Sequence, residues 1–170
     1  MAGTLTVQNL QGPSTGANAN KVLIPSGQTL HAPGHVIQTV QANFSGNSIA
    51  SSTTWVATVI EASITPTSSN NKIFISIYSG MDNNDTNRNL QATIYRNNTL
   101  NLYQGASPYF GYAVNSAGRI IIPMLIQYTD SPATTSSVTY TLYHRSGGSY
   151  TTEIPGTNQT QQITLMEIAQ

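Results

Sequence analysis

The sequence predicts an all-β protein: an antiparallel β-sandwich of jelly-roll type with about eight to ten strands, preceded by an extended N-terminal arm. Three observations predict this class. Short runs rich in Ile, Val, Thr and Tyr alternate in hydrophobicity with the period of a strand. Clusters of Ser, Thr, Asn, Gly and Pro separate these runs at intervals of about ten residues. No stretch shows an apolar repeat at helical spacing with capping residues.

The clearest strand signals are runs in which β-branched and aromatic residues alternate with polar ones: residues 55–65, 72–78, 90–96, 119–128, 138–145 and 162–168. Weaker signals are present at residues 36–44, 99–103, 109–114 and 150–154. Turn-forming clusters such as TPTSSNN, RNN, NSAG, TDSPATTSS and RSGG connect them. Pro123 interrupts an apolar run, so we expect an edge strand or a bulge there, because proline cannot donate to a sheet ladder.

Residues 1–35 differ from residues 36–170, the predicted sandwich domain. They are rich in Gly, Asn and Pro and hold two short apolar patches that cannot bury a core. One interpretation is a flexible tail. The other is an extended arm that anchors the chain to a partner by adding strands or docking in a groove. The pattern NKVLIPSGQTL favours the arm, with an anchor segment formed by Val22, Leu23, Ile24 and Leu30.

Charge is scarce: Asp, Glu, Lys and Arg make up 7% of the chain and the net charge is zero, against about 25% charged residues in ordinary soluble domains. The basic residues are scattered, which excludes a phosphate-binding patch and hence a nucleic-acid partner. No apolar run approaches the length of a membrane span, which requires about 18 residues. Cysteine is absent, and no export signal is recognisable, so we expect folding in a reducing cytoplasm.

The sequence predicts no catalytic residue, no cofactor and no metal. The sequence contains no G-x-S-x-G motif, and a cysteine nucleophile is impossible. His31 and His35 are interpreted as polar loop residues and His144 as an exposed strand residue, although a triad assembled from distant positions is the alternative. Pro33 and Gly34 forbid the helix on which His31 and His35 would share a metal.

Two glutamates are the carboxylates that a glycosidase would need, Glu61 and Glu153. Glu61 interrupts an apolar strand, which singles it out. The simpler expectation is that it faces solvent or pairs with an arginine such as Arg96. We therefore predict no enzyme, with a glycan hydrolase as the alternative that these carboxylates leave open.

The stretch SGMDNNDTNRN, residues 79–89, is the most polar part of the chain and contains Asp82 and Asp85. Compared with the EF-hand pattern, Asn87 stands where the sharp turn requires glycine, and Thr93 replaces the bidentate glutamate. We therefore predict an exposed hairpin connection between the two flanking strands. A calcium loop of another type is the alternative.

The segment YQGASPYFGY concentrates aromatic residues around a predicted loop. Tyr103, Tyr109 and Tyr112 are candidate glycan contacts, because tyrosine rings can stack on the faces of sugars. The alternative is that these rings face the core or a subunit interface, where tyrosine is enriched.

Four stretches, GHVIQTVQANFS, SITPTSSNNKIFISI, DSPATTSSVTYTLYHRS and ITLMEIAQ, together resemble small structural proteins of tailed bacteriophages of the marine and cyanobacterial type. The resemblance spans roughly residues 34–170. It implies a non-enzymatic component of the virion surface: a capsid decoration protein or head fibre, with a tail-fibre-like or host-glycan-binding module as the alternative. Its implied partners are other virion proteins, further copies of the chain, with a trimer favoured, and host surface glycans. The chain would assemble in the host cytoplasm.

Overall fold

The computed structural model describes most of the chain, namely residues 11–19, 21–24, 26, 32–83, 88–103, 109–113, 120–154 and 160–170. The chain divides into two compact units, Met1–His31 and Ala32–Gln170. The division falls four residues before the arm boundary expected from the sequence. Every described strand belongs to the second unit.

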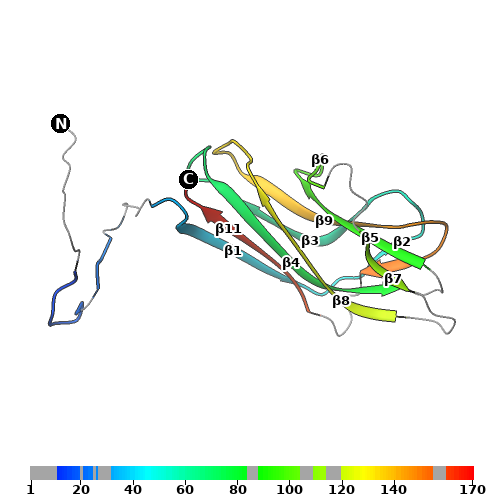
Figure 1. The fold of residues 1–170 in the computed structure, drawn as a ribbon, viewed down its shortest axis with the longest axis horizontal. Helices are drawn as coiled ribbons and strands as arrows, with labels where there is room; N and C mark the ends of the chain where they lie inside the picture. The colour runs from blue at the N-terminus through cyan, green and yellow to red at the C-terminus, as the bar shows by residue number, and fades with distance from the viewer. Residues whose placement is uncertain are drawn as a thin grey trace. The chain divides into compact units, whose positions relative to one another are not determined.

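Eleven strands and no helix are found among the described residues (Figure 1), which confirms the all-β class. Their bounds are β1 (Val36–Phe44), β2 (Ser48–Ala50), β3 (Val56–Ile64), β4 (Lys72–Asn83), β5 (Arg88–Arg96), β6 (Leu100–Asn101), β7 (Tyr109–Ala113), β8 (Ile120–Asp130), β9 (Val138–Ser146), β10 (Thr152–Ile154) and β11 (Gln161–Ile168). The short β2 had no predicted counterpart. Every strand predicted within residues 36–170 has an observed one.

The strands form two antiparallel sheets, which confirms the β-sandwich. The six-stranded sheet has the order β1-β11-β4-β10-β2, with β8 on the other side of β4. The five-stranded sheet has the order β3-β9-β5-β6, with β7 also paired to β5. Within the described part of the chain, β8 pairs with β4 alone, so Pro123 lies in an edge strand, as predicted, and the β4–β8 register is unbroken around it.

The prediction that residues 79–89 connect a hairpin is wrong. β4 belongs to the six-stranded sheet and β5 to the five-stranded sheet, so this connection passes from one sheet to the other. β4 also continues to Asn83, five residues beyond the predicted end. Its polar final residues form a strand because β8 and β10 pair with them on either side.

The core lies between the sheets and follows the alternation of the strands. On β4, Ile73, Ile75 and Ile77 are fully buried, and they pack with the inward residues of the five-stranded sheet. The largest of those inward residues is Tyr140, whose hydroxyl donates a 2.8 Å hydrogen bond to Asp130. Arg96 pairs with the same carboxylate at 2.9 Å. An ion pair from β5 to β8 thus joins the two sheets near the end of the core.

A second polar joint surrounds Glu167 of β11, which is fully buried. Its Oε1 accepts hydrogen bonds from the main-chain N–H of Thr67 at 2.7 Å, the Thr67 hydroxyl at 2.8 Å and the Asn71 amide at 2.6 Å. Its Oε2 accepts one from the Gln38 amide at 2.6 Å. Burial alone would raise the pKa of Glu167, but these donors outweigh it and lower the pKa. The carboxylate therefore fixes the β3–β4 turn and β1 onto β11.

Candidate functional site

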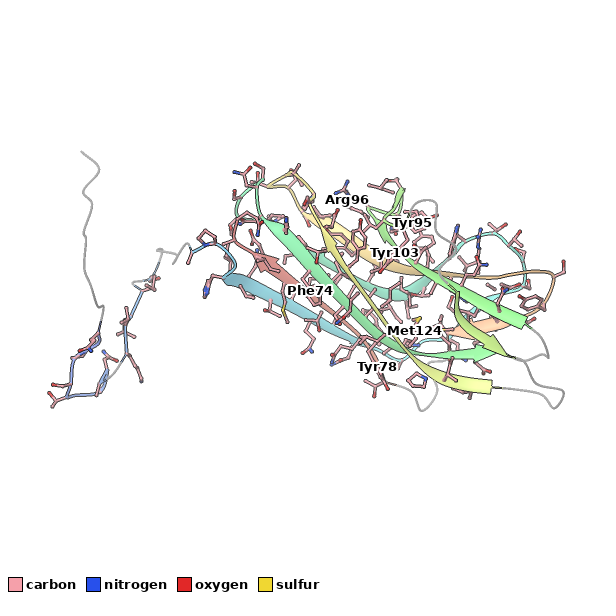
Figure 2. The ribbon with its side chains drawn as sticks, in the orientation of Figure 1. Phe74, Tyr78, Tyr95, Arg96, Tyr103 and Met124 are labelled. Carbon is pink, nitrogen blue, oxygen red and sulfur yellow. The ribbon has the colours of Figure 1, made fainter. Side chains whose placement is uncertain are left out.

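Tyr103, the first candidate glycan contact, is engaged within the protein. Its hydroxyl donates a 2.5 Å hydrogen bond to the main-chain carbonyl of Gln127 on β8. Its ring lies 5.1 Å from that of Tyr128 and packs against the core. Burial, and then the neighbouring Tyr128, raise the pKa of Tyr103. Figure 2 labels this residue. Its placement gives Tyr103 a packing role at the edge strand β8.

Tyr109 and Tyr112 lie on β7, and their side chains fall outside the described part of the structure. The backbone register pairs them with Gln91 and Asn89 of β5. A register shift between Leu90 and Gln91 separates the two pairs. Both tyrosines therefore lie in the five-stranded sheet, whereas Tyr103 lies in the turn that follows β6.

The structure brings together aromatic side chains that the sequence analysis did not select. Tyr95 of β5 and Tyr143 of β9 stack on the outer side of the five-stranded sheet, with ring centroids 4.1 Å apart. The guanidinium of Arg145, on the same face, lies 4.4 Å from the ring centroid of Trp55. The Nε of Arg145 donates to Gln91 at 2.6 Å. We name the outer residues Trp55, Tyr95, Tyr143 and Arg145 the aromatic face.

The aromatic face has the composition of a sugar-binding surface, with partly buried rings beside hydroxyl, amide and guanidinium groups. The Arg145–Trp55 contact and the Tyr95–Tyr143 stack also stabilise the fold, by about 0.5–1.5 kcal/mol each. The signal that could have found this face is the odd-numbered parity of Tyr95 and Tyr143 along their strands, once the β5–β9 register is known.

The predicted anchor segment lies in the first unit. Val22, Leu23 and Ile24 are described, and their side chains are exposed, at 48%, 58% and 43% respectively. Leu30 lies outside the described residues. Three consecutive exposed apolar side chains form a contact surface that is available to a partner.

The two candidate carboxylates lie on different sheets. Glu61 of β3 is exposed and accepts a 3.3 Å hydrogen bond from the Thr141 hydroxyl. Glu153 of β10 accepts one from the Asn47 amide at 2.5 Å. The arginine suggested as a partner for Glu61, Arg96, pairs instead with Asp130.

His144 is completely buried, so the expectation of an exposed strand residue is wrong. It lies on the inner side of β9, which is flanked on both sides by β3 and β5. Its Nε2 is 2.8 Å from the Ser48 hydroxyl, and its Nδ1 has no hydrogen-bond partner among the described residues. Burial lowers the pKa of His144 to about 4, so the imidazole is neutral near pH 7. His35 is exposed, and His31 is not among the described residues.

The Ser48–His144 contact joins a hydroxyl to an imidazole, as in a nucleophile and its base, but it lacks the usual third group. Catalytic His residues of this kind are oriented by an acceptor on the second ring nitrogen. Here the described residues supply no acceptor to that nitrogen. The Ser48 hydroxyl gives the other nitrogen of the buried imidazole a partner.

Asp82, from the polar stretch tested for calcium, is 1% exposed and lies within β4 rather than at a loop tip. Asp85 lies outside the described residues. In the parts of the chain that are described, no group of three or more His, Asp or Glu side chains is arranged to hold a metal. The same parts form no helix long and apolar enough to cross a membrane.

The chain matches no protein-family model and no curated protein sequence. The interpretation of its function therefore depends on the arrangement of its own residues.

Proposed function

We propose that this chain is a non-enzymatic structural protein on the surface of a tailed-phage virion, a capsid decoration or head-fibre protein anchored by its N-terminal arm. Further copies of the chain and other virion proteins are its proposed partners. The proposal joins the family resemblance of the sequence to one observation of the structure.

That observation is the division of the chain into an N-terminal unit with exposed apolar residues and a sandwich that holds every described strand. The sandwich has its own core and its own polar joints at Asp130 and Glu167. The first unit presents Val22, Leu23 and Ile24 outward. A self-contained domain preceded by an apolar attachment segment suits a protein that projects from a larger particle.

A truncation that removes residues 2–33 tests the anchor. The truncated protein should fold, with a thermal melting transition close to that of the full chain, and should be missing from purified particles. A full-length variant in which Val22, Leu23 and Ile24 are replaced by serine is the finer test, and it should also fail to incorporate. Normal incorporation of either protein would refute the anchor.

A second candidate function is host-glycan binding, and the aromatic face favours it. Trp55, Tyr95 and Tyr143 place rings on the outer side of the five-stranded sheet, and Tyr109 and Tyr112 lie on β7 of the same sheet. Apolar ring faces next to hydrogen-bonding groups are the chemistry that recognises a pyranose.

A glycan array, followed by Tyr→Ala substitutions, tests this candidate. Binding that is lost on replacing Tyr109, Tyr112 and Tyr143, and kept on replacing Tyr103 by Phe, would assign the glycan to the five-stranded sheet. No binding to any host polysaccharide would leave the structural role alone.

A further inference from the structure

Over four adjacent strands, the outer side of the six-stranded sheet carries no charged residue between Lys72 and Asp82 of β4. We name as the uncharged face the outward-pointing residues within 39–43 of β1, 162–166 of β11, 74–80 of β4 and 121–129 of β8. Each of these positions is apolar, amide, hydroxyl or glycine. Lys72 borders the face at one end, and Asp82, which is 1% exposed and pairs with Ile121, borders it at the other. Figure 2 labels Phe74 and Tyr78, which lie on this side of β4.

The centre of the uncharged face is apolar. Tyr78 and Leu125 lie opposite each other on β4 and β8, and they are 43% and 56% exposed. Ile121, further along β8, is 45% exposed. Phe74 and Met166 form another cross-strand pair on the same side. Exposed apolar side chains that are neighbours in a sheet form a patch, and such patches mark interaction sites.

The polar part of the uncharged face is made of groups that both donate and accept. Gln162 donates to Asn43 at 2.9 Å, and Gln127 donates to the Ser76 hydroxyl at 3.3 Å. Amides and hydroxyls retain further donors and acceptors of both kinds beyond these bonds. A surface that offers donors and acceptors together, and no charge, is complementary to a copy of itself.

The face has the size of a weak contact. Its four ranges hold 26 strand residues, and each covers about 16 Å² at about 4.8 Å between strands and about 3.3 Å along them. Two copies would then bury about 820 Å² in total, which lies at the small end of protein interfaces, so we expect a weak dimer.

We infer that the uncharged face is a self-association surface that packs against the same face of a second copy of this chain. Such a contact relates the two copies by a two-fold axis, so it forms a dimer rather than the trimer favoured from the sequence. The Tyr78–Leu125 pair supplies the apolar centre, and the Gln, Asn, Ser and Thr side chains around it supply the hydrogen bonds. The inference concerns the purified chain and does not depend on the virion role.

Analytical ultracentrifugation of the full-length chain tests this surface. We expect a dimer whose dissociation constant is independent of salt, because no charge lies in the contact. Leu125→Glu should raise that constant at least about 100-fold, since it places like charges in a desolvated contact. Val59→Glu is the matched control, because Val59 is a 47% exposed apolar residue on the outer side of the other sheet. It should leave the dimer unchanged.

Gln127→Lys, at an exposed position of β8, replaces Leu125→Glu if that variant fails to fold. A wild-type chain that stays monomeric, or a dimer that survives the β8 substitution, would overturn the inference. A monomeric chain whose incorporation into particles is lost with Leu125→Glu would assign the face to a different virion protein. That result would overturn self-association and leave the proposed function intact.

Discussion

The two outer faces of the sandwich differ in chemistry although they cover the same core. The six-stranded sheet presents the uncharged face, with Tyr78 and Leu125 exposed at its centre. The five-stranded sheet presents Glu61 and Arg145 together with aromatic rings that already contact one another or a guanidinium. Charges and satisfied rings suit a surface that stays in water, whereas an uncharged face with open apolar side chains suits one that a partner covers.

The buried titratable groups of the two sheets differ in the same way. Glu167 of the six-stranded sheet is charged and is held by donors from three neighbouring residues. His144 of the five-stranded sheet is neutral near pH 7, and no described residue bonds its Nδ1. The stability of the six-stranded sheet therefore depends on a buried charged carboxylate, and that of the five-stranded sheet on a buried imidazole that stays neutral.

Removal of the buried charge should have the largest effect on stability. Glu167→Gln should lower the free energy of unfolding by about 2–4 kcal/mol, because charge-assisted bonds are lost and the new amide group faces existing donors. Glu61→Gln is the same substitution on the outer side of the other sheet, and it should change stability by no more than about 0.5 kcal/mol. Urea denaturation of both variants measures the difference. Equal effects would remove the distinction between the two carboxylates.

Mild acid should act on the five-stranded sheet. The pKa of His144 is lowered to about 4 in the folded chain, against about 6.5 in the unfolded one, so protonation favours unfolding. The contribution of His144 is complete above pH 6.5 and is lost as the pH falls toward 4. At pH 5 the loss should be about 2 kcal/mol. Glu167 has a lowered pKa, so its stabilising effect is lost only when the pH falls below the ordinary pKa of a glutamate. It therefore does not contribute at pH 5.

Urea denaturation at several pH values between 7 and 5 measures the effect of His144. A His144→Gln variant removes the titrating group and should show a nearly flat profile over the same range. A wild-type profile as flat as that of the variant would contradict the neutral, buried assignment.

Removing the Tyr140 hydroxyl, which joins the two sheets through Asp130, should lower stability less than the changes at Glu167 and His144. Tyr140→Phe keeps the buried ring and removes the donor to Asp130, so stability should fall by about 1–2 kcal/mol. The exposed Tyr78→Phe is the control and should be nearly neutral. A stability loss in Tyr140→Phe no larger than in the control would show that the hydroxyl does not support the joint.

The smallest difference is expected on the outer faces themselves. Tyr143→Phe keeps the stack on Tyr95 and should cost less than about 0.5 kcal/mol, whereas Tyr143→Ala should cost about 1 kcal/mol more because the stacked pair is lost. Thermal melting of the two variants in parallel resolves this difference. Identical melting of both would indicate that the stacked rings add nothing to the sheet.

The sequence predicted the sandwich and most of its strands because the alternation of VTYTLYHR, KIFISIY and QITLMEI is local information. The same alternation indicates that His144 is buried, because it points to the same side of the strand as Val138, Tyr140 and Leu142. Its side chain is polar but follows the parity of the strand, so the predicted exposure was wrong. Thr67 and Glu167 lie in two of the four stretches that carry the family resemblance, and the structure brings them into contact.

Features that depend on pairing between distant strands could not be predicted. The stack of Tyr95 on Tyr143 requires the β5–β9 register, and the uncharged face requires the order β1-β11-β4-β8. The passage of residues 79–89 between sheets is of the same kind, because a turn-rich stretch does not specify which sheet the next strand joins. Candidate sites on the outer faces can therefore be identified only when the strand order and register are known.

The central claim, a place on the virion surface, is tested most directly by negative-stain electron microscopy of purified phage particles labelled with an antibody to this chain. Our account predicts label on the outer surface of intact capsids, and its loss when residues 2–33 are deleted. Particles that carry no label, prepared from lysates in which the chain is abundant, would contradict it.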